Sequence, residues 1–94
     1  MALAFEWDRR KAQANLRKHG VAFAEAMTVF QDPLGRLVDD WRHSVGEERY
    51  ALLGTSTAGR LIAVMFTERG ERIRLISARR ATPSERQHYE ETKR

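Results

Sequence analysis

The segment from Glu48 to Ala78 restricts the fold of this chain more than any other part of the sequence. It contains three segments with the apolar, β-branched content of strands, at 48–55, 60–67 and 72–78, with only short turns between them. Ser56 to Gly59 forms the first turn, and Gly70 supplies a positive φ to the second. Connections this short join neighbouring strands that run in opposite directions. The sequence therefore predicts an antiparallel sheet.

The middle strand, Arg60 to Thr67, contains the uninterrupted apolar run Leu-Ile-Ala-Val-Met-Phe. Such a run is typical of a strand that is buried on both faces, so we place it at the centre of the sheet. The next strand alternates between two sets of residues, with Ile73, Leu75 and Ser77 on one face and Arg72, Arg74 and Ile76 on the other. One face is thus expected to carry helices and the other to carry arginines.

A short strand from Leu3 to Trp7 and two helices are predicted before this sheet. Asp8 caps a first helix that runs to about His19, and Gly20 ends it. A second helix runs from about residue 22 to residue 30, where Asp32-Pro33 stops it. Its apolar side chains form one stripe, at Phe23, Ala26, Met27 and Phe30. We interpret residues 34–40 as a further strand and residues 41–48 as a polar loop.

The last helix has a well-defined start. Thr82 is the N-cap, Pro83 takes the first helical position, and Glu85 completes a capping box. Beyond Tyr89 this helix has almost no apolar face, which is typical of a helix that is either solvated or bound to a partner. The predicted fold class is α+β: a small antiparallel sheet with two N-terminal helices on one face and a C-terminal helix. The whole chain, 1–94, is read as a single domain.

Composition limits the chemistry that the chain can perform. It has no cysteine, which excludes a disulfide, a Cys-ligated metal and a thiol nucleophile. His19, His43 and His88 lie far apart in the sequence, so we predict no metal site, and no glycine loop for a phosphate cofactor is present. Without a signal peptide or an apolar run that spans a bilayer, the protein is expected in the cytoplasm.

The charge balance is basic, with 17 Lys and Arg against 13 Asp and Glu. This excess permits a polyanionic partner such as nucleic acid, but a plain solvated basic surface explains it equally well. The arginine and proton-carrying residue types suit metal-free cleavage of RNA by its own 2′-hydroxyl. That reaction needs a base, positive charge on the developing phosphorane, and an acid for the leaving oxygen.

Three stretches resemble a known family: "FEWDRRKAQANLRKHGV" at 5–21, "FAEAMTVFQDP" at 23–33 and "TERGERIRLISARRATPSERQHYE" at 67–90. They look like the BrnT-type toxins of bacterial type II toxin–antitoxin pairs. The resemblance implies a fold similar to RelE-type ribonucleases and an endoribonuclease activity that halts translation. It also implies neutralisation by a small BrnA-type antitoxin, whose DNA-binding part lets the complex repress its own operon.

We assign candidate roles on the residues that match this pattern. Glu68 or His19 would accept a proton, while Arg49 and Arg79 would bind phosphate and stabilise the transition state. The RNA-contact face would consist of Lys11, Arg17, Lys18, Arg69 and Arg74, with Trp7 as a candidate base-stacking platform.

Simpler interpretations stay open beside these roles. Arg79 would instead tie strand to helix by pairing with an acid such as Glu85 or Asp8. Trp7 would pack under the first helix, and Lys18 and His19 would only stabilise that helix's C-terminal dipole. The rival function is a non-catalytic module that binds nucleic acid or the antitoxin.

Overall fold

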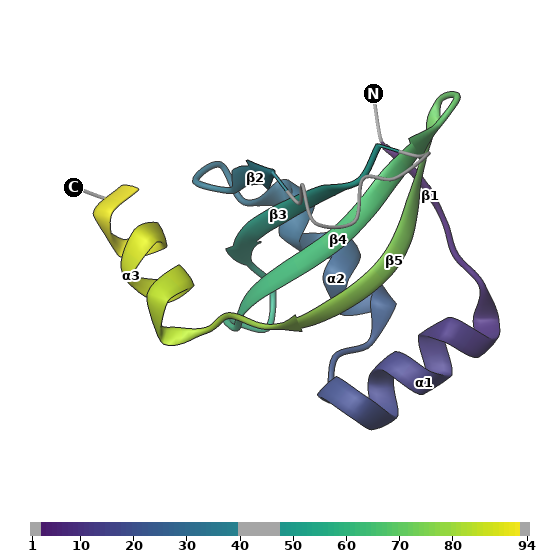
Figure 1. Cartoon of the computed structure of the whole chain (residues 1–94), viewed down its shortest axis with the longest axis horizontal. Coiled ribbons are helices and arrows are strands. Elements are labelled where there is room, and N and C mark those ends of the chain that lie inside the picture. Colours follow the sequence, from purple (N-terminus) through teal and green to yellow (C-terminus); the bar gives the residue numbers. More distant parts are fainter. Residues whose placement is uncertain (1–2, 40–47, 93–94) are drawn as a thin grey trace.

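A five-stranded sheet forms the centre of the protein, with the strand order β1-β5-β4-β3-β2 (Figure 1). The structure is a computed structural model that describes residues 3–39 and 48–92. Most of the predicted loop at 41–48 lies outside these residues. The strands are β1 (Ala4–Glu6), β2 (Arg36–Asp39), β3 (Tyr50–Thr55), β4 (Leu61–Arg69) and β5 (Arg72–Arg80).

The pairing of the strands is antiparallel from β2 to β5, as predicted. The first strand is different, because β1 lies parallel to β5, with Phe5 opposite Ile73. A parallel pair needs a long connection, and the chain between β1 and β5 supplies it. The sheet is therefore mixed at this one edge, and the α+β fold class is confirmed.

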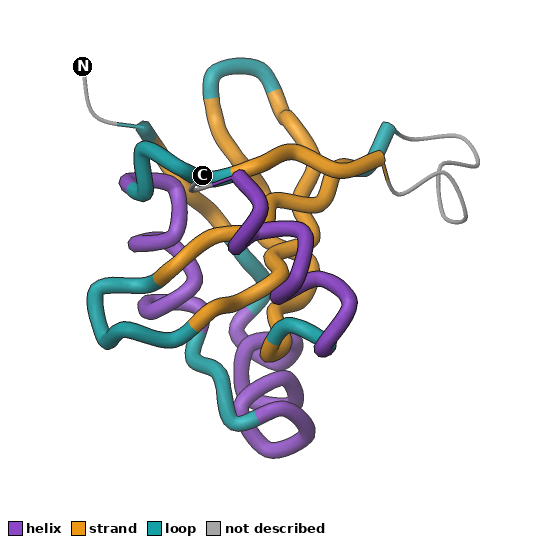
Figure 2. Tube along the Cα trace, turned by 90° about the vertical axis from the view of Figure 1, so that its left-hand side faces the viewer, coloured by secondary structure: helices purple, strands orange, loops and turns teal. Residues whose placement is uncertain are grey.

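The helices lie on both sides of the sheet. α1 (Arg9–His19), α2 (Phe23–Thr28) and the 3₁₀ turn η1 (Val29–Gln31) pack on one face, so the predicted second helix changes type before it ends. α3 (Pro83–Thr92) packs on the other face, and Figure 2 shows α2 and α3 on opposite sides of the strands.

The main core lies between α1, α2 and the sheet. Ile62, Val64, Leu75, Val21 and Val29 are its largest fully buried side chains, each worth about 1.5–3 kcal/mol on burial. The predicted stripe of the second helix contributes to this core, with Phe23 and Ala26 buried and Met27 and Phe30 half-buried. A smaller cluster on the opposite face holds Leu53, Leu61, Ala63 and Tyr89.

The predicted helix ends are confirmed in detail. The carboxylate of Asp8 accepts hydrogen bonds from the backbone N–H of Arg10 at 2.8 Å and of Lys11 at 3.1 Å, which lower the pKa of Asp8. Gly20 ends α1 with a φ of 68°. At the start of α3, Thr82 and Glu85 form the reciprocal capping box at 2.8 and 3.1 Å.

A β-bulge in β5 changes the predicted alternation of that strand. Met65 lies opposite Ser77, but the next residue of β4, Phe66, lies opposite Leu75, so Ile76 is the extra residue. The bulge moves Ser77 and Arg79 to the face that carries Arg72 and Arg74. The prediction that Ser77 shares a face with Leu75 was therefore wrong, because it assumed an uninterrupted period of two.

Candidate functional site

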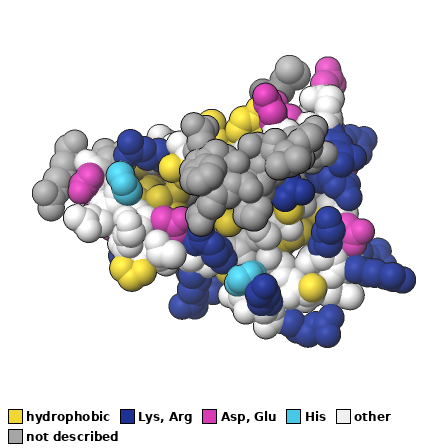
Figure 3. Space-filling model, viewed as in Figure 1, with side chains coloured by type: hydrophobic (Ala, Val, Ile, Leu, Met, Phe, Trp, Pro, Cys, Tyr) yellow, Lys and Arg dark blue, Asp and Glu magenta, His cyan; other side chains and the backbone are white. Residues whose placement is uncertain are grey.

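The sheet face opposite α1 and α2 carries most of the arginines that the strands contain. The strand register places five of them on it, and Arg49, one residue before β3, continues the alternation of that strand. We call this surface the arginine face: Arg36, Arg49, Arg69, Arg72, Arg74 and Arg79. Figure 3 looks onto this side and shows basic side chains gathered toward β5 and α1. The sheet thus separates the apolar face under α1 and α2, which we call the helix-covered side, from a face that carries these arginines and the smaller apolar cluster under α3.

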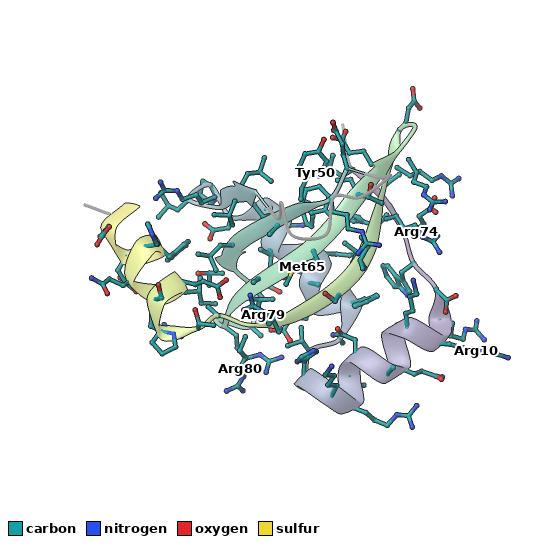
Figure 4. All side chains as sticks on the ribbon, in the orientation of Figure 1. Arg10, Tyr50, Met65, Arg74, Arg79 and Arg80 are labelled. Atoms are coloured by element: carbon teal, nitrogen blue, oxygen red, sulfur yellow. The ribbon has the colours of Figure 1, made fainter. Side chains whose placement is uncertain are left out.

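Three rows of residues cross β3, β4 and β5 on the arginine face. The first row is Thr67 and Arg74, with Arg49 next to it just before β3. The second row is Ala51, Met65 and Ser77, and the third is Leu53, Ala63 and Arg79. Figure 4 shows Met65 between Arg74 and Arg79. Positive charge therefore lies on both sides of a row that carries none.

Arg79 is held by a carboxylate of α3. Its two terminal nitrogens donate to the two carboxylate oxygens of Glu85 at 2.7 and 3.0 Å, and one of them also donates to the carbonyl oxygen of Arg80. The Arg79 guanidinium lowers the pKa of Glu85. The simpler interpretation of Arg79, a tie between strand and helix, describes the contact that this structure contains.

Arg74 has a similar arrangement at the edge of the sheet. Its guanidinium donates to the carboxylate of Glu6 on β1 at 2.8 Å, and both side chains are about one-quarter exposed, at 28% and 27%. Since β1 and β5 are paired at Glu6 and Arg74, this ion pair also links the two strands that lie parallel.

Arg49 differs from both of these arginines. It is half-buried just before β3, and its Nε atom is the one buried side-chain nitrogen that has no hydrogen-bond partner within the described ranges 3–39 and 48–92. A buried, unsatisfied donor costs about 1–3 kcal/mol, so it needs a reason to be retained. Thr67 donates to the carbonyl oxygen of Glu48, the preceding residue, so Arg49 lies next to the row that Thr67 forms with Arg74.

The two predicted proton carriers lie in different places. Glu68 is opposite Ile73, so the register puts it on the helix-covered side at the exposed end of β4, near Tyr50. Tyr50 donates to Glu48 at 2.6 Å, and this hydrogen bond raises the pKa of Tyr50. Glu68 therefore does not share a face with Arg49, Arg74 and Arg79.

His19 lies on α1, which packs on the face of the sheet that α2 also covers. It is one helical turn after Asn15, on the same side of α1, and Asn15 contacts Ala78, the neighbour of Arg79. His19 is half-buried at the end of α1. This places the imidazole on the α1 side of the sheet, whereas the side chain of Arg79 lies on the opposite face.

The other predicted RNA contacts divide into two groups. Lys11, Arg17 and Lys18 are exposed on α1, and Arg69 is exposed at the end of β4. Trp7 instead packs edge-on against Phe23 of the main core, with ring centroids 5.9 Å apart. This is the packing role that the sequence left open for Trp7.

Asn15 is a site residue to which the sequence gave no role. It is 6% exposed, and its side-chain amide forms hydrogen bonds with both backbone groups of Ala78 and with the carbonyl oxygen of Val21. The sequence offered two signals at Asn15: a polar residue among the apolar positions of α1, and a place in the segment that resembles the family. The bond partners lie far away in sequence and could not be read from it.

α3 is docked on the arginine face through Tyr89. The ring is buried against Leu53, Leu61 and Ala63, and its hydroxyl donates to Asp32 at 2.5 Å and accepts from Thr55 at 3.1 Å. Burial first, and then the hydrogen bond to Asp32, raise the pKa of Tyr89. The helix is therefore neither freely solvated nor dependent on another chain for its contact with the sheet.

Two further observations concern metal ligands and membrane-spanning helices. Among the residues that the structure describes, no three His, Asp or Glu side chains are grouped as metal ligands. None of the helices in these ranges is long and apolar enough to cross a membrane.

A small α+β domain with a cationic sheet face has the charge distribution that is typical of the class of proteins that bind polyanions such as RNA. The family model described as "Ribonuclease toxin, BrnT, of type II toxin-antitoxin system" matches residues 7–85. This match covers most of the chain, so the chain belongs to that family, as its sequence motifs predict. Most of α3 follows the last matched residue, Glu85.

A solved structure supports the same assignment. The ribonuclease toxin BrnT of Brucella abortus, known from a crystal structure at 1.1 Å resolution, is 25% identical in sequence and aligns with a TM-score of 0.66. The alignment covers 86% of this chain and 99% of the Brucella chain. The comparison with curated proteins gave no match.

Proposed function

We propose that this chain is an endoribonuclease that cleaves RNA without a metal ion and thereby inhibits translation. The 2′-hydroxyl of the substrate would attack the adjacent phosphorus and release the 5′-oxygen of the next nucleotide. The observation that carries this proposal is Arg49, whose buried Nε has no partner in the described part of the chain and lies on the arginine face. Membership of a ribonuclease toxin family supports the reaction class.

Arg49 is the guanidinium best placed to receive a phosphate. Arg79 and Arg74 already have carboxylate partners, Glu85 and Glu6, so each must exchange a carboxylate for a phosphate before it stabilises the transition state. Carboxylate and phosphate both accept charge-assisted hydrogen bonds from a guanidinium in similar geometry, so the free energy cost of such an exchange is small. In this scheme Arg49 provides the permanent phosphate ligand and Arg79 joins it when RNA is bound.

His19 is the favoured proton acceptor, with Glu68 as the alternative. His19 is one helical turn from Asn15, which bonds to the backbone of Ala78 next to Arg79, whereas Glu68 lies opposite Ile73 at the other end of the β4–β5 pair. Lys11, Arg17, Lys18 and Arg69 are exposed and would add phosphate contacts beyond the reacting nucleotide.

The partner that controls this activity would be a BrnA-type antitoxin, in keeping with a type II family. Its DNA-binding part would let the toxin–antitoxin complex repress its own operon. RNA and antitoxin would both be met in the cytoplasm.

The test is digestion of RNA by the purified protein in the presence of a chelator. We expect cleavage that survives chelation and falls about 10²–10³-fold in Arg49→Ala, the usual loss for one charge-stabilising donor. Arg86→Ala, an exposed arginine of α3, is the matched control and should retain full activity. Cleavage that disappears on chelation would refute the metal-free mechanism.

The ion pairs of Arg74 and Arg79 favour a second candidate, a module that binds RNA or antitoxin without turnover. In that case the same assay would leave RNA intact while the protein still binds it. The logarithm of the binding constant should then fall linearly with the logarithm of the salt concentration, with a slope of about −0.7 for each phosphate neutralised on a single strand.

A further inference from the structure

The middle row of the arginine face has the composition of a contact surface for a planar, uncharged group. Met65 stands between Ala51 and Ser77, which lie directly opposite it on the two neighbouring strands. All three residues are half-buried, and both neighbours have short side chains that extend less far from the sheet than the Met65 side chain does. A thioether is polarisable and makes favourable contacts with aromatic rings at about 5 Å.

The rows on either side of Met65 carry positive charge. Arg74 lies in the row of Thr67 with Arg49 next to it, and Arg79 lies in the row of Ala63. Thr67 and Ala63 are four residues apart on β4, which corresponds to about 13 Å along a strand. A single RNA strand that touches both charged rows must therefore follow β4 and pass over Met65.

The aromatic side chains that could receive a base have other contacts. Trp7 packs against Phe23, and Tyr50 stacks on Phe66 with centroids 5.5 Å apart, both on the helix-covered side of the sheet. Tyr89 is buried beneath α3. Within residues 3–39 and 48–92, no exposed aromatic side chain remains on the arginine face, and Met65 is the half-buried apolar side chain at the middle of its central row.

We propose that the row Ala51, Met65 and Ser77 is a binding site for one RNA base, with phosphates held by Arg49 on one side and Arg79 on the other. The ring would lie against the Met65 thioether, and the Ser77 hydroxyl, which both donates and accepts, would bind a polar edge of the base. This inference rests on the proposed function for its ligand, RNA, but not for the cleavage step.

The experiment uses wild-type protein labelled with ¹³C at the methionine methyl groups. The probes are a 2′-O-methyl RNA trinucleotide, which lacks the attacking hydroxyl, and the same molecule with an abasic central position. We expect the Met65 methyl resonance to move with the first probe and to stay in place with the second. Met27, on the helix-covered side, is the internal control and should move with neither.

A variant gives an independent measurement. Met65→Ala should weaken binding of the complete trinucleotide about tenfold, within the range that base-stacking contacts span, and leave the abasic probe's affinity unchanged. Met65→Leu, which keeps the apolar volume, should lose much less. If the alanine variant does not fold, the wild-type spectra alone decide whether Met65 contacts the base.

The outcomes separate this inference from the proposed function. Equal Met65 shifts with both probes, or no shift at saturating trinucleotide, would overturn the base site even if the protein cleaves RNA. A Met65 shift that needs the base, in a protein that never cleaves unmodified RNA, would support the base site and overturn the nuclease. Absence of any trinucleotide binding would overturn both.

Discussion

Asn15 forms with Ala78 the pair of hydrogen bonds that a neighbouring β-strand would form. Its Oδ1 accepts from the Ala78 N–H at 3.0 Å, and its Nδ2 donates to the Ala78 carbonyl oxygen at 2.8 Å. β1 pairs with β5 only from Arg72 to Arg74, so the side-chain amide continues the sheet where β1 has ended. Nδ2 also donates to Val21 at 2.9 Å. One buried group thereby joins α1, the connection to α2 and the strand that carries Arg79.

Asn15→Ala should be strongly destabilising. It leaves both backbone groups of Ala78 and the carbonyl oxygen of Val21 without partners in a buried place. We expect the free energy of unfolding to fall by about 2–4 kcal/mol, measured by urea denaturation. Gln13→Ala, an exposed change on the same helix, should stay within about 0.5 kcal/mol of wild type. A loss below about 1 kcal/mol at Asn15 would contradict this account.

Local signals were sufficient to predict most elements of the fold. Asp8, Gly20 and the pair Thr82 and Glu85 mark helix ends through contacts with residues no more than a few positions away. The apolar run of β4 required burial on both faces, and the strand lies at the centre of the sheet. Features of this kind depend on spacing along the chain, which a sequence displays directly.

The features that could not be predicted depend on distant partners. Nothing near Ile76 indicates a bulge, yet without it Arg79 and Arg74 would lie on opposite faces of β5. The contact of Asn15 with Ala78 spans 63 positions. Sequence analysis correctly grouped arginines on one face, but the carboxylates that hold Arg74 and Arg79 come from separate elements, β1 and α3.

Glu85→Gln should affect stability and RNA binding in opposite directions. Glutamine keeps the capping box but not the charge. The free energy of unfolding should therefore fall by about 0.5–1 kcal/mol near pH 7, which is the typical contribution of a part-exposed ion pair. Under the proposed function, an Arg79 without this carboxylate should bind RNA more tightly. Fluorescence anisotropy with labelled RNA measures this, and Glu91→Gln, exposed on α3, is the charge-matched control. Unchanged or weaker RNA binding would argue that Glu85 positions Arg79 instead of competing for it.

The same ion pair should make stability depend on pH in the acid range. Arg79 lowers the pKa of Glu85 below its usual value of 4.5, so the stabilisation is complete above that pH and disappears as pH falls through the lower, folded-state pKa. The difference in unfolding free energy between wild type and Glu85→Gln should therefore shrink below about pH 4.5. Urea titrations from pH 7 to pH 3 measure it, and a constant difference would show that the pair contributes no charge-dependent stability.

Arg49→Met should separate stability from activity. The substitution removes a buried nitrogen that has no partner in the described part of the chain and keeps a similar apolar stem, so we expect stability within about 1 kcal/mol of wild type or higher. RNA cleavage should still fall about 10²–10³-fold. Thermal unfolding and single-turnover cleavage, run beside Arg86→Met, provide the two measurements. A large loss of stability would instead make Arg49 a structural residue.

Tyr89→Phe should loosen α3 without disturbing the centre of the sheet. The variant keeps the ring among Leu53, Leu61 and Ala63 but loses the hydroxyl that bonds to Asp32 and Thr55. We expect a loss of about 1–2 kcal/mol, because Asp32 still accepts from the backbone N–H groups of Leu34 and Thr55. Hydrogen exchange should accelerate in α3 and stay unchanged in β4.

The pH dependence of this variant gives a second, independent check. Burial and Asp32 raise the pKa of Tyr89 above its usual value of 10.0, so the neutral hydroxyl stabilises the fold below that pH, and the contribution is lost as pH rises through the higher, folded-state pKa. The stability difference between wild type and Tyr89→Phe should be constant from pH 7 to 9 and diminish above about pH 10. Gln87→Ala changes an exposed residue two positions before Tyr89 in α3, and its stability should follow the wild-type dependence on pH throughout. Equal acceleration of exchange in α3 and β4 would mean that Tyr89 supports the whole fold and not the docking of one helix.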